Sequence, residues 1–229
     1  MVNNAVGGDS LCRMIGFSYP ESRDIGDLVD HLKHMAEKGM KAPHSHGWGI
    51  YATDGENVFY YKTMTPVYED VDVHLEMSLG ILHARKASGD VPITPLQLQP
   101  FISLDGVVFC HNGTIKTSES ANVFSSDSYD YFFNVREFAD LDDLVNRLRS
   151  FLRVNRYSGA NFLMLKSSKL YVFCAHESRH DYYTLWYNTD DGFVVTSEPR
   201  DTGGYTPMEN GELLEVERGK VIARIKSVV

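Results

Sequence analysis

The amino-acid sequence predicts an α+β fold built from two packed antiparallel sheets with helices covering them. Strand-like patterns dominate both ends of the 229-residue chain, and its helical patterns are too few and too unevenly placed for a doubly wound sheet. With 43% hydrophobic residues, the chain can bury one well-packed core. No linker and no internal repeat divides it, so one domain is favoured over two small ones.

The first elements follow from hydrophobic spacing. Residues 12–18 form a short apolar run that predicts a buried strand. Residues 24–39 carry apolar side chains at helical spacing and end in glycine, which predicts a helix with its C-terminal cap. Two strands at 48–53 and 57–63 flank an Asp-Gly dipeptide at 54–55, the pattern of a β-hairpin.

The rest of the chain continues the alternation of strands and turns, with one helical stretch in the middle. A second Asp-Gly dipeptide, at 105–106, predicts another hairpin turn. In order, the expected elements are a short helical segment at 71–77, a strand at 78–88, a loop at 89–100, a hairpin at 101–113, a polar loop at 118–128, one or two helices at 129–155, and strands with turns at 160–176, 181–198 and 211–225.

Composition limits the classes of function. A net charge of -9 disfavours nucleic-acid binding, because an acidic surface repels phosphate backbones. Three cysteines without zinc-ligand spacing argue against a disulfide scaffold or a metal site and favour a reducing, cytoplasmic setting. No apolar run reaches the ~20 residues that span a bilayer. Residues 1–11 lack a basic residue and an apolar core, so they do not match a secretory signal.

Three cysteines also raise the question of a nucleophile. A cysteine on an apolar strand is most often a small buried hydrophobe, and that interpretation suits Cys110 and Cys174, which lie in dense apolar runs. Cys12 opens a strand instead and is followed directly by Arg13. On its own this supports catalysis only weakly.

A second candidate segment is His-Ala-Arg-Lys-Ala-Ser at 83–88. His83 and Arg85 lie two residues apart on the expected strand and therefore point to one face of the sheet. An arginine at a strand end, with Ser88 three residues on, can bind a carboxylate through a bidentate pair. A surface salt bridge is the commoner alternative for such an arginine.

Two further segments carry polar groups suited to a reaction site. The side-chain amide of Asn112 and the backbone N–H of Gly113 can form an oxyanion hole, although an Asn-Gly turn is the frequent alternative. Asp127, between two serines, can bind an ammonium group or simply cap the helix that follows.

Taken in order, these segments resemble the class II glutamine amidotransferase domain. The order is Cys-Arg, Gly-Trp-Gly-Ile, His-x-Arg-x-Ala-Ser, Pro-Phe, His-Asn-Gly and Ser-Asp-Ser. The later Ser-Glu-Pro at 197–199 and Gly-Glu-Leu-Leu at 211–214 are similar to the end of the stand-alone members. The resemblance covers nearly all of residues 12–229 and is specific as an ordered set, whereas each short motif is not.

The resemblance implies a fold and a domain division. The fold is the four-layer αββα sandwich of the N-terminal-nucleophile (Ntn) hydrolases, in agreement with the strand-rich pattern. By this resemblance, residues 1–11 correspond to a leader, or propeptide, and residues 12–229 correspond to the amidotransferase-like domain. The segment at 44–50 resembles a structural strand of the family to which no catalytic role is assigned.

The resemblance also implies site roles. Cys12 attacks the glutamine side-chain amide and serves as its own base through its α-amino group, while Asn112 and the N–H of Gly113 stabilise the oxyanion. A free α-amine has a pKa near ~7.7–8.0, so part of it is unprotonated at neutral pH. For substrate binding, Arg85 holds the glutamine α-carboxylate with assistance from Ser88. Asp127 holds the α-ammonium. Neither a metal nor another cofactor is implied.

The sequence departs from the family pattern mainly in the position of the cysteine. Cys12 is not residue 2, so either the leader is cleaved at Leu11–Cys12, where the same thiol can attack the Leu11 carbonyl, or the true start of the chain lies later. The other departures bear on substrate details more than on reaction class. They are Gln99 where members usually carry His, Tyr129 where an acidic residue often stands, and Lys86 where a bulky apolar residue is frequent.

Three functions follow as alternatives. The first is glutamine hydrolysis through a γ-glutamyl thioester, with the ammonia passing to a separate synthetase subunit or with no transfer at all. The second is hydrolysis of another γ-glutamyl or small amide by the same residues. The third is a non-catalytic Ntn-fold module that binds a partner.

Overall fold

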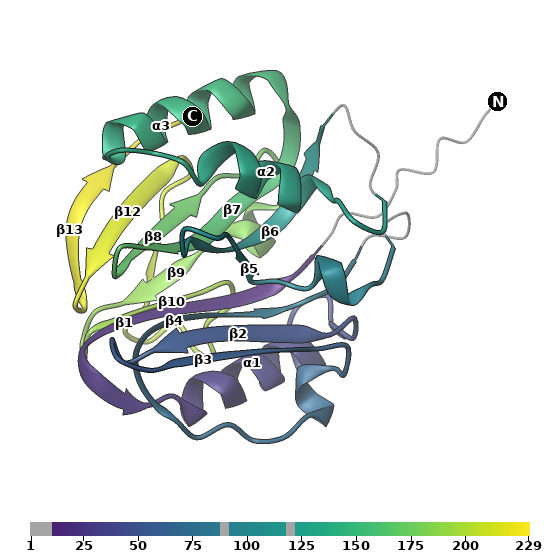
Figure 1. The fold of residues 1–229 in the computed structure, drawn as a ribbon, viewed down its shortest axis with the longest axis vertical. Helices are drawn as coiled ribbons and strands as arrows, with labels where there is room; N and C mark the ends of the chain where they lie inside the picture. Colours follow the sequence, from purple (N-terminus) through teal and green to yellow (C-terminus); the bar gives the residue numbers. More distant parts are fainter. Residues whose placement is uncertain (1–10, 88–91, 118–121) are drawn as a thin grey trace.

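The computed structural model describes residues 11–87, 92–117 and 122–229. Two antiparallel sheets are stacked face to face, and helices cover both outer faces (Figure 1). Helix α1 (Gly26–Lys38) lies on one sheet, while α2 (Asp127–Val135) and α3 (Leu141–Val154) lie on the other. The expected four-layer αββα sandwich is therefore confirmed.

The sheet under α1 has seven strands, and the first strand of the chain lies in its middle. The strand order is β11-β9-β10-β1-β4-β2-β3. In chain order, the bounds are β1 (Arg13–Asp24), β2 (Trp48–Thr53), β3 (Val58–Thr63), β4 (Glu76–Ala84), β9 (Trp186–Asn188), β10 (Phe193–Thr196) and β11 (Thr206–Pro207). Because β1 has a partner on each side, the end of β1 that carries Cys12 is fixed by two neighbouring strands.

The sheet under α2 and α3 has six strands, in the order β13-β12-β8-β7-β6-β5. The bounds are β5 (Phe101–Ile102), β6 (Val108–Lys116), β7 (Arg156–Lys166), β8 (Lys169–Cys174), β12 (Glu212–Glu217) and β13 (Lys220–Ile225). Short helical turns lie in the connections: η1 (Val67–Glu69), η2 (Pro95–Gln97) and α4 (His180–Tyr183).

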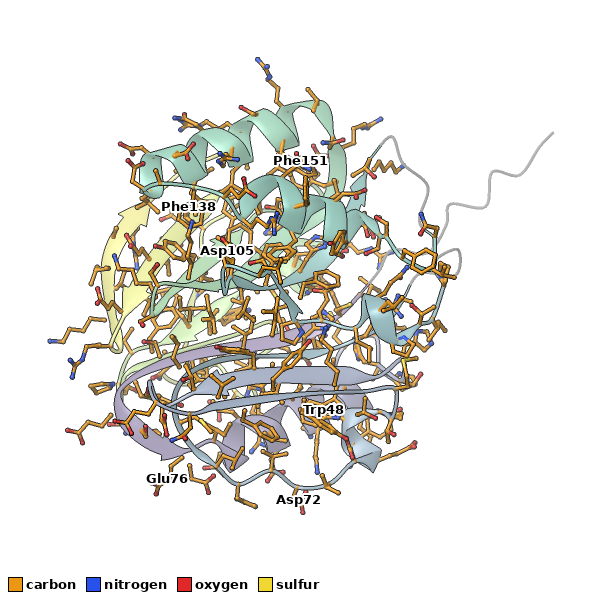
Figure 2. All side chains as sticks on the ribbon, in the orientation of Figure 1. Trp48, Asp72, Glu76, Asp105, Phe138 and Phe151 are labelled. Carbon is orange, nitrogen blue, oxygen red and sulfur yellow. The ribbon has the colours of Figure 1, made fainter. Side chains whose placement is uncertain are left out.

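Three apolar layers hold the sandwich together. Along β1, Met14 packs between the two sheets, whereas Ile15 and Phe17 pack toward α1, as the alternation of side chains along a strand requires. Figure 2 shows Trp48 in the layer next to α1, and Phe138 and Phe151 in the layer next to α2 and α3. By the same alternation, the side chain of Cys12 is directed to the side of Met14, toward the facing sheet.

Most expected elements are present. The helix at 24–39 and the hairpins around 54–55 and 105–106 are confirmed. The helix expected at 71–77 is wrong, since residues 71–75 have no regular secondary structure and β4 begins at Glu76. Its apolar residues Val73, Leu75 and Met77 recur at every second position, and this strand-like spacing allows the segment to cover the α1 layer. Within the described ranges, no helix is both long and apolar enough to cross a bilayer.

Candidate active site

Cys12 is held by hydrogen bonds on both sides of its own backbone. It precedes β1 directly and is only 2% exposed. Its backbone N–H donates to Oδ1 of Asn112 at 3.0 Å, and its carbonyl accepts from the hydroxyl of Tyr182 at 3.0 Å. The sulfur lies 3.9 Å from the carbonyl oxygen of Lys86. These contacts fix the thiol at the junction between the two sheets.

Arg13 anchors the end of β1 on the opposite side. Its buried guanidinium donates to the carbonyls of Met40 at 2.7 Å and Ser197 at 3.3 Å, and it forms an ion pair with Glu198. The same group stacks on the ring of Tyr182, 4.2 Å from the ring centre. Arg13 therefore joins the strand that carries Cys12 to three other parts of the chain.

Asn112 and Gly113 lie on β6 of the facing sheet, beside Cys12. Oδ1 of the fully buried Asn112 accepts from Cys12, while its Nδ2 has no partner among the described residues. A buried amide N–H without an acceptor is costly, so it is a natural donor for a substrate oxygen. Gly113 has φ +150°, and a side chain here would lie 1.8 Å from the Gly159 carbonyl oxygen. Only glycine allows β6 and β7 to approach this closely.

Arg85 is a buried cation, 4% exposed, just beyond the end of β4. Its Nη2 donates to Oε1 of Gln97 at 3.0 Å and to the carbonyl of Pro92 at 3.2 Å. Within the described ranges Nη1 has no partner, and no carboxylate forms an ion pair with this guanidinium. Burial lowers the pKa of Arg85, and the nearby Cys12 and Asp127 raise it. The site thus presents a desolvated positive charge without a bound counter-ion.

Asp127 is the first residue of α2, and both of its carboxylate oxygens accept backbone N–H groups. Oδ2 accepts from Ile115 and Oδ1 from Ser128, each at 2.8 Å. Ser126 caps the helix by accepting the N–H of Tyr129 at 3.3 Å. The capping function considered for Asp127 is thus performed by Ser126. Asp127 is fixed in place with lone pairs left for a cationic ligand.

The side chains enclose one small pocket. Its walls come from Cys12, Arg85, Ala87, Gln97, Gln99, Ser126, Asp127 and Ser128. The enclosed space is about 20 Å³, which is room for about one water molecule. Gln97 occupies the inner side of Arg85 and also donates to the carbonyls of Asn122 and Ser125. An amino-acid ligand therefore requires that Gln97 and its loop move away from Arg85.

Two buried histidines, His111 and His83, pack behind the residues that line the pocket. Nδ1 of His111 lies 2.9 Å from the Ser128 hydroxyl, and its Nε2 lies 3.2 Å from the Gly159 carbonyl. His83 lies 3.3 Å from the His111 carbonyl through its Nε2. Burial lowers the pKa of both rings, that of His83 to about 3. Both are neutral at physiological pH, so neither supplies a positive charge to the site.

The structure brings together most of the residues that the sequence singled out. Cys12, Arg85 and Asp127 line the same pocket, and Asn112 and Gly113 adjoin it on β6. Ser88 lies outside the described residues. Cys110 and Cys174 are fully buried, as expected, and burial raises the pKa of each thiol, that of Cys174 to about 12.

Sequence analysis missed three residues that contact the site: Gln97, Tyr182 and His44. Gln97 and Tyr182 belong to no recognisable motif, because each reaches the site through a loop or a short helix distant in sequence, whereas His44 begins the segment at 44–50, to which no catalytic role is assigned. Tyr182, for example, bonds a residue 170 positions away. Across the described parts of the chain, no group of three or more His, Cys, Asp or Glu side chains has the arrangement of a metal site.

No family model and no curated protein matches this sequence. Several solved structures match its fold. Glutamine phosphoribosylpyrophosphate amidotransferase from B. subtilis is 18% identical over 94% of this chain, with a TM-score of 0.64. The chain spans about half of that protein, 49% of its length.

Two shorter proteins match over nearly their whole lengths. A predicted glutamine amidotransferase from Pseudomonas aeruginosa is 21% identical over 93% of this chain and 96% of its own, with a TM-score of 0.55. A glutamine aminotransferase class-II domain protein from Silicibacter pomeroyi is 14% identical over 94% of this chain and 99% of its own, with a TM-score of 0.61. These likenesses establish the expected fold, that of the class II glutamine amidotransferases.

Proposed function

We propose that this protein is an amidohydrolase that releases ammonia from glutamine through a γ-glutamyl thioester on Cys12. The observation that carries the proposal is the meeting of three groups from separate segments around one thiol. Arg85 supplies a buried cation, Asp127 a carboxylate, and Asn112 an unpartnered N–H donor, all within one pocket or on its wall.

The two charges orient the substrate. Free glutamine is a zwitterion, so one cation and one anion suffice to fix its amino-acid end. Nη1 of Arg85 binds the α-carboxylate, with Ser88 assisting, and Asp127 binds the α-ammonium. A charge-assisted hydrogen bond of this kind contributes about 1.5–3 kcal/mol, enough to displace the neutral Gln97 amide from Arg85.

The reaction then proceeds at the side-chain amide. The Cys12 sulfur adds to the amide carbon, and the oxygen develops negative charge. Nδ2 of Asn112, buried and otherwise unpartnered, donates to this oxygen together with the N–H of Gly113. Collapse of the intermediate expels ammonia and leaves the thioester, which water hydrolyses to glutamate.

The base for these steps is the α-amine of Cys12, which requires that residues 1–11 be removed. In the present structure the nitrogen of Cys12 is part of the peptide bond to Leu11, and its N–H donates to Oδ1 of Asn112 at 3.0 Å. After cleavage the same bond orients the free amine. The released ammonia passes to an acceptor on a separate partner subunit.

Intact mass and glutamine hydrolysis, measured on one preparation of the full-length chain, test this proposal. We expect loss of residues 1–11, ammonia release, and a mass increase of one γ-glutamyl group on Cys12 after rapid acid quench. A Cys12→Ser variant is the control and should lose both ammonia release and the thioester.

Three results contradict the proposal in different ways. An active preparation that keeps Met1 excludes the α-amine as base. Inert glutamine alongside a reactive γ-glutamyl amide shifts the proposal to that substrate class. A Cys12→Ser protein with full biological activity favours a partner-binding module instead.

A further inference from the structure

Ser128 places a buried hydroxyl in the wall of the pocket, next to Asp127. It is the second residue of α2 and is 8% exposed. Cys12 and Arg85 line the same small pocket, so a ligand bound at the thiol lies near this hydroxyl. The hydrogen bonds behind Ser128 decide whether it meets that ligand as a donor or as an acceptor.

The ring of His111 fixes the direction of the Ser128 hydroxyl proton. Nε2 of His111 lies 3.2 Å from the Gly159 carbonyl, which can only accept, so Nε2 carries the ring proton. Burial lowers the pKa of this ring, and the neutral ring has no second proton. Its Nδ1, 2.9 Å from the Ser128 oxygen, is therefore an acceptor. The Ser128 hydroxyl donates to Nδ1, which leaves oxygen lone pairs for the pocket.

The backbone N–H groups at this end of α2 are already bonded. The N–H of Ser128 donates to Oδ1 of Asp127 at 2.8 Å. Those of Tyr129 and Asp130 donate to the hydroxyl and carbonyl oxygens of Ser126, at 3.3 and 3.0 Å. A helix N-terminus ordinarily attracts anions through such groups. Here the carboxylate of Asp127 and the oxygen of Ser128 are both acceptors, so this end of the pocket suits a cation.

We propose that Ser128 binds the substrate's α-ammonium as a hydrogen-bond acceptor beside Asp127, and that His111 is the positioning residue that holds the hydroxyl in this orientation. This inference rests on the proposed function, in which the substrate is glutamine. An ammonium group has three N–H donors, so it can bond to the Asp127 carboxylate and to the Ser128 oxygen at once.

The arrangement selects ligands that carry a free α-ammonium. A ligand without this group leaves two buried acceptors unpaired, and unpaired polar groups in a closed site are costly. An acyl group on the α-nitrogen removes the charge and two of the donors. The substrate class is therefore amides of amino acids with an unmodified α-amino group, and α-N-acylated glutamine is excluded.

Isothermal titration with L-glutamate tests the role of Ser128 in the same preparation that is assayed for ammonia release. L-Glutamate carries both charged groups of glutamine and has no amide to hydrolyse. We expect Ser128→Ala to raise its Kd about ten- to a hundredfold, the effect of losing a hydrogen bond to a charged group. Ser103→Ala is the matched control and should not change Kd, since Ser103 is equally buried but its hydroxyl bonds to Val107 between β5 and β6.

A second ligand shows whether the loss depends on the ammonium. Glutarate is L-glutamate without its α-amino group, so it gives Ser128 nothing to accept. Its Kd should stay the same or fall in Ser128→Ala, because the substitution removes an acceptor that glutarate leaves unpaired. An equal loss of affinity for both ligands overturns the inference, since it shows general damage to the pocket. An unchanged Kd for L-glutamate also overturns it.

His111→Phe tests the positioning role. The phenyl ring fills similar space but offers no acceptor, so the Ser128 hydroxyl is released to turn its proton toward the ammonium. We expect the single variant to raise the Kd of L-glutamate about tenfold. In the Ser128→Ala background the same change should add less than about twofold, because the hydroxyl through which it acts is gone. Full additivity in the double variant overturns the positioning role.

His111→Asn serves if His111→Phe does not fold. Its side-chain oxygen is an acceptor near the position of Nδ1, so the Kd of L-glutamate should stay within about threefold of wild type. A loss as large as that of Ser128→Ala overturns the role of His111. If glutarate binds too weakly to titrate, the comparison of the His111 variants with and without Ser128 decides alone.

The outcomes separate this inference from the proposed function. A protein that binds L-glutamate with the expected ratios but releases no ammonia keeps the ammonium site and loses the hydrolase proposal. A protein that releases ammonia, but whose affinity for L-glutamate does not depend on Ser128, keeps the hydrolase and loses this inference. Absence of L-glutamate binding in the wild type overturns the ammonium site outright.

Discussion

At the scale of single residues, the site is defined by hydrogen-bonding groups that its own chain leaves unused. Nη1 of Arg85 and Nδ2 of Asn112 are both buried without a partner among the described residues. Most buried polar groups in folded proteins are satisfied, so two such donors beside one thiol indicate a place for a ligand. Each donor yields a separate kinetic prediction.

Arg85→Ala should weaken glutamine binding more than it slows the reaction. Loss of the charge-assisted carboxylate contact, about 1.5–3 kcal/mol, should raise KM by roughly ten- to a hundredfold. The turnover number should change by only a few-fold, since Arg85 does not contact the amide. Steady-state kinetics on processed enzyme measure both values. An unchanged KM for glutamine would show that another group binds the carboxylate.

Asn112→Asp should have the opposite effect. The substitution keeps an acceptor for the nitrogen of Cys12 but places negative charge where the oxyanion forms, so we expect kcat to fall by at least about 10²–10³ with KM nearly constant. Thermal melting controls for folding, because the carboxylate is buried. Normal kcat in a processed Asn112→Asp enzyme would exclude this side chain from the oxyanion site.

At the scale of secondary-structure elements, the contact between β6 and β7 determines where the proposed oxyanion donors, Asn112 and Gly113, lie. Gly113 and Gly159 touch backbone to backbone, and an added Cβ on Gly113 would overlap the Gly159 carbonyl. The position of Asn112, one residue earlier, depends on this close approach. The hairpin between β5 and β6 contains another positive-φ glycine, Gly106, whose surroundings are open.

These two glycines make a matched pair for mutation. Gly106→Ala should lower the free energy of unfolding by about 1 kcal/mol, the result of placing alanine at positive φ. Gly113→Ala should lower it by at least ~3 kcal/mol and abolish glutamine hydrolysis, because strain and overlap add. Urea unfolding and activity assays test both variants. Equal destabilisation by the two substitutions would contradict the close contact.

The helices and strands also show which features of the fold and the site could be predicted from the sequence alone. Helix α1 and both hairpins follow from local spacing, whereas the segment at 71–77 is not helical, and its apolar residues at every second position pack into the α1 layer. Cys12, Arg85, Asn112 and Asp127 could be predicted as a group because they resemble an ordered set of motifs. The residues that pack around Leu11, such as Tyr182, could not be predicted from the sequence. Tyr182 lies in a four-residue helix with no distinctive pattern, and its role depends on a contact across most of the chain.

At the scale of the whole molecule, buried histidines link stability to pH. Burial lowers the pKa of His31 to about 4, of His44 and His83 to about 3, and also lowers that of His111. Unfolding exposes these rings and restores pKa values near ~6.5. Below that pH the unfolded chain binds more protons than the folded chain, so stability falls as pH decreases.

We therefore expect the free energy of unfolding to be constant above about pH 7 and to fall steeply between about pH 6.5 and 4. Each histidine contributes a slope of at most ~1.4 kcal/mol per pH unit. Urea titrations at several pH values measure the slope. His31→Gln should lower the slope by the contribution of one bound proton. His74→Gln, which replaces an exposed ring paired with Asp24, should not lower it. An unchanged slope in His31→Gln would mean that this ring is protonated in the folded protein.

The central position of β1 has a consequence for the spacing of its first residues. Successive side chains on a strand face opposite ways, so the sulfur of Cys12 and the core residue Met14 share one face only because a single residue separates them. Inserting one amino acid at that point would rotate the thiol toward α1 and away from Asn112, while the rest of the strand kept its register. The proposed chemistry thus depends on an odd number of residues between Cys12 and the core residue Met14, and a side-chain substitution could not compensate for a change in that number.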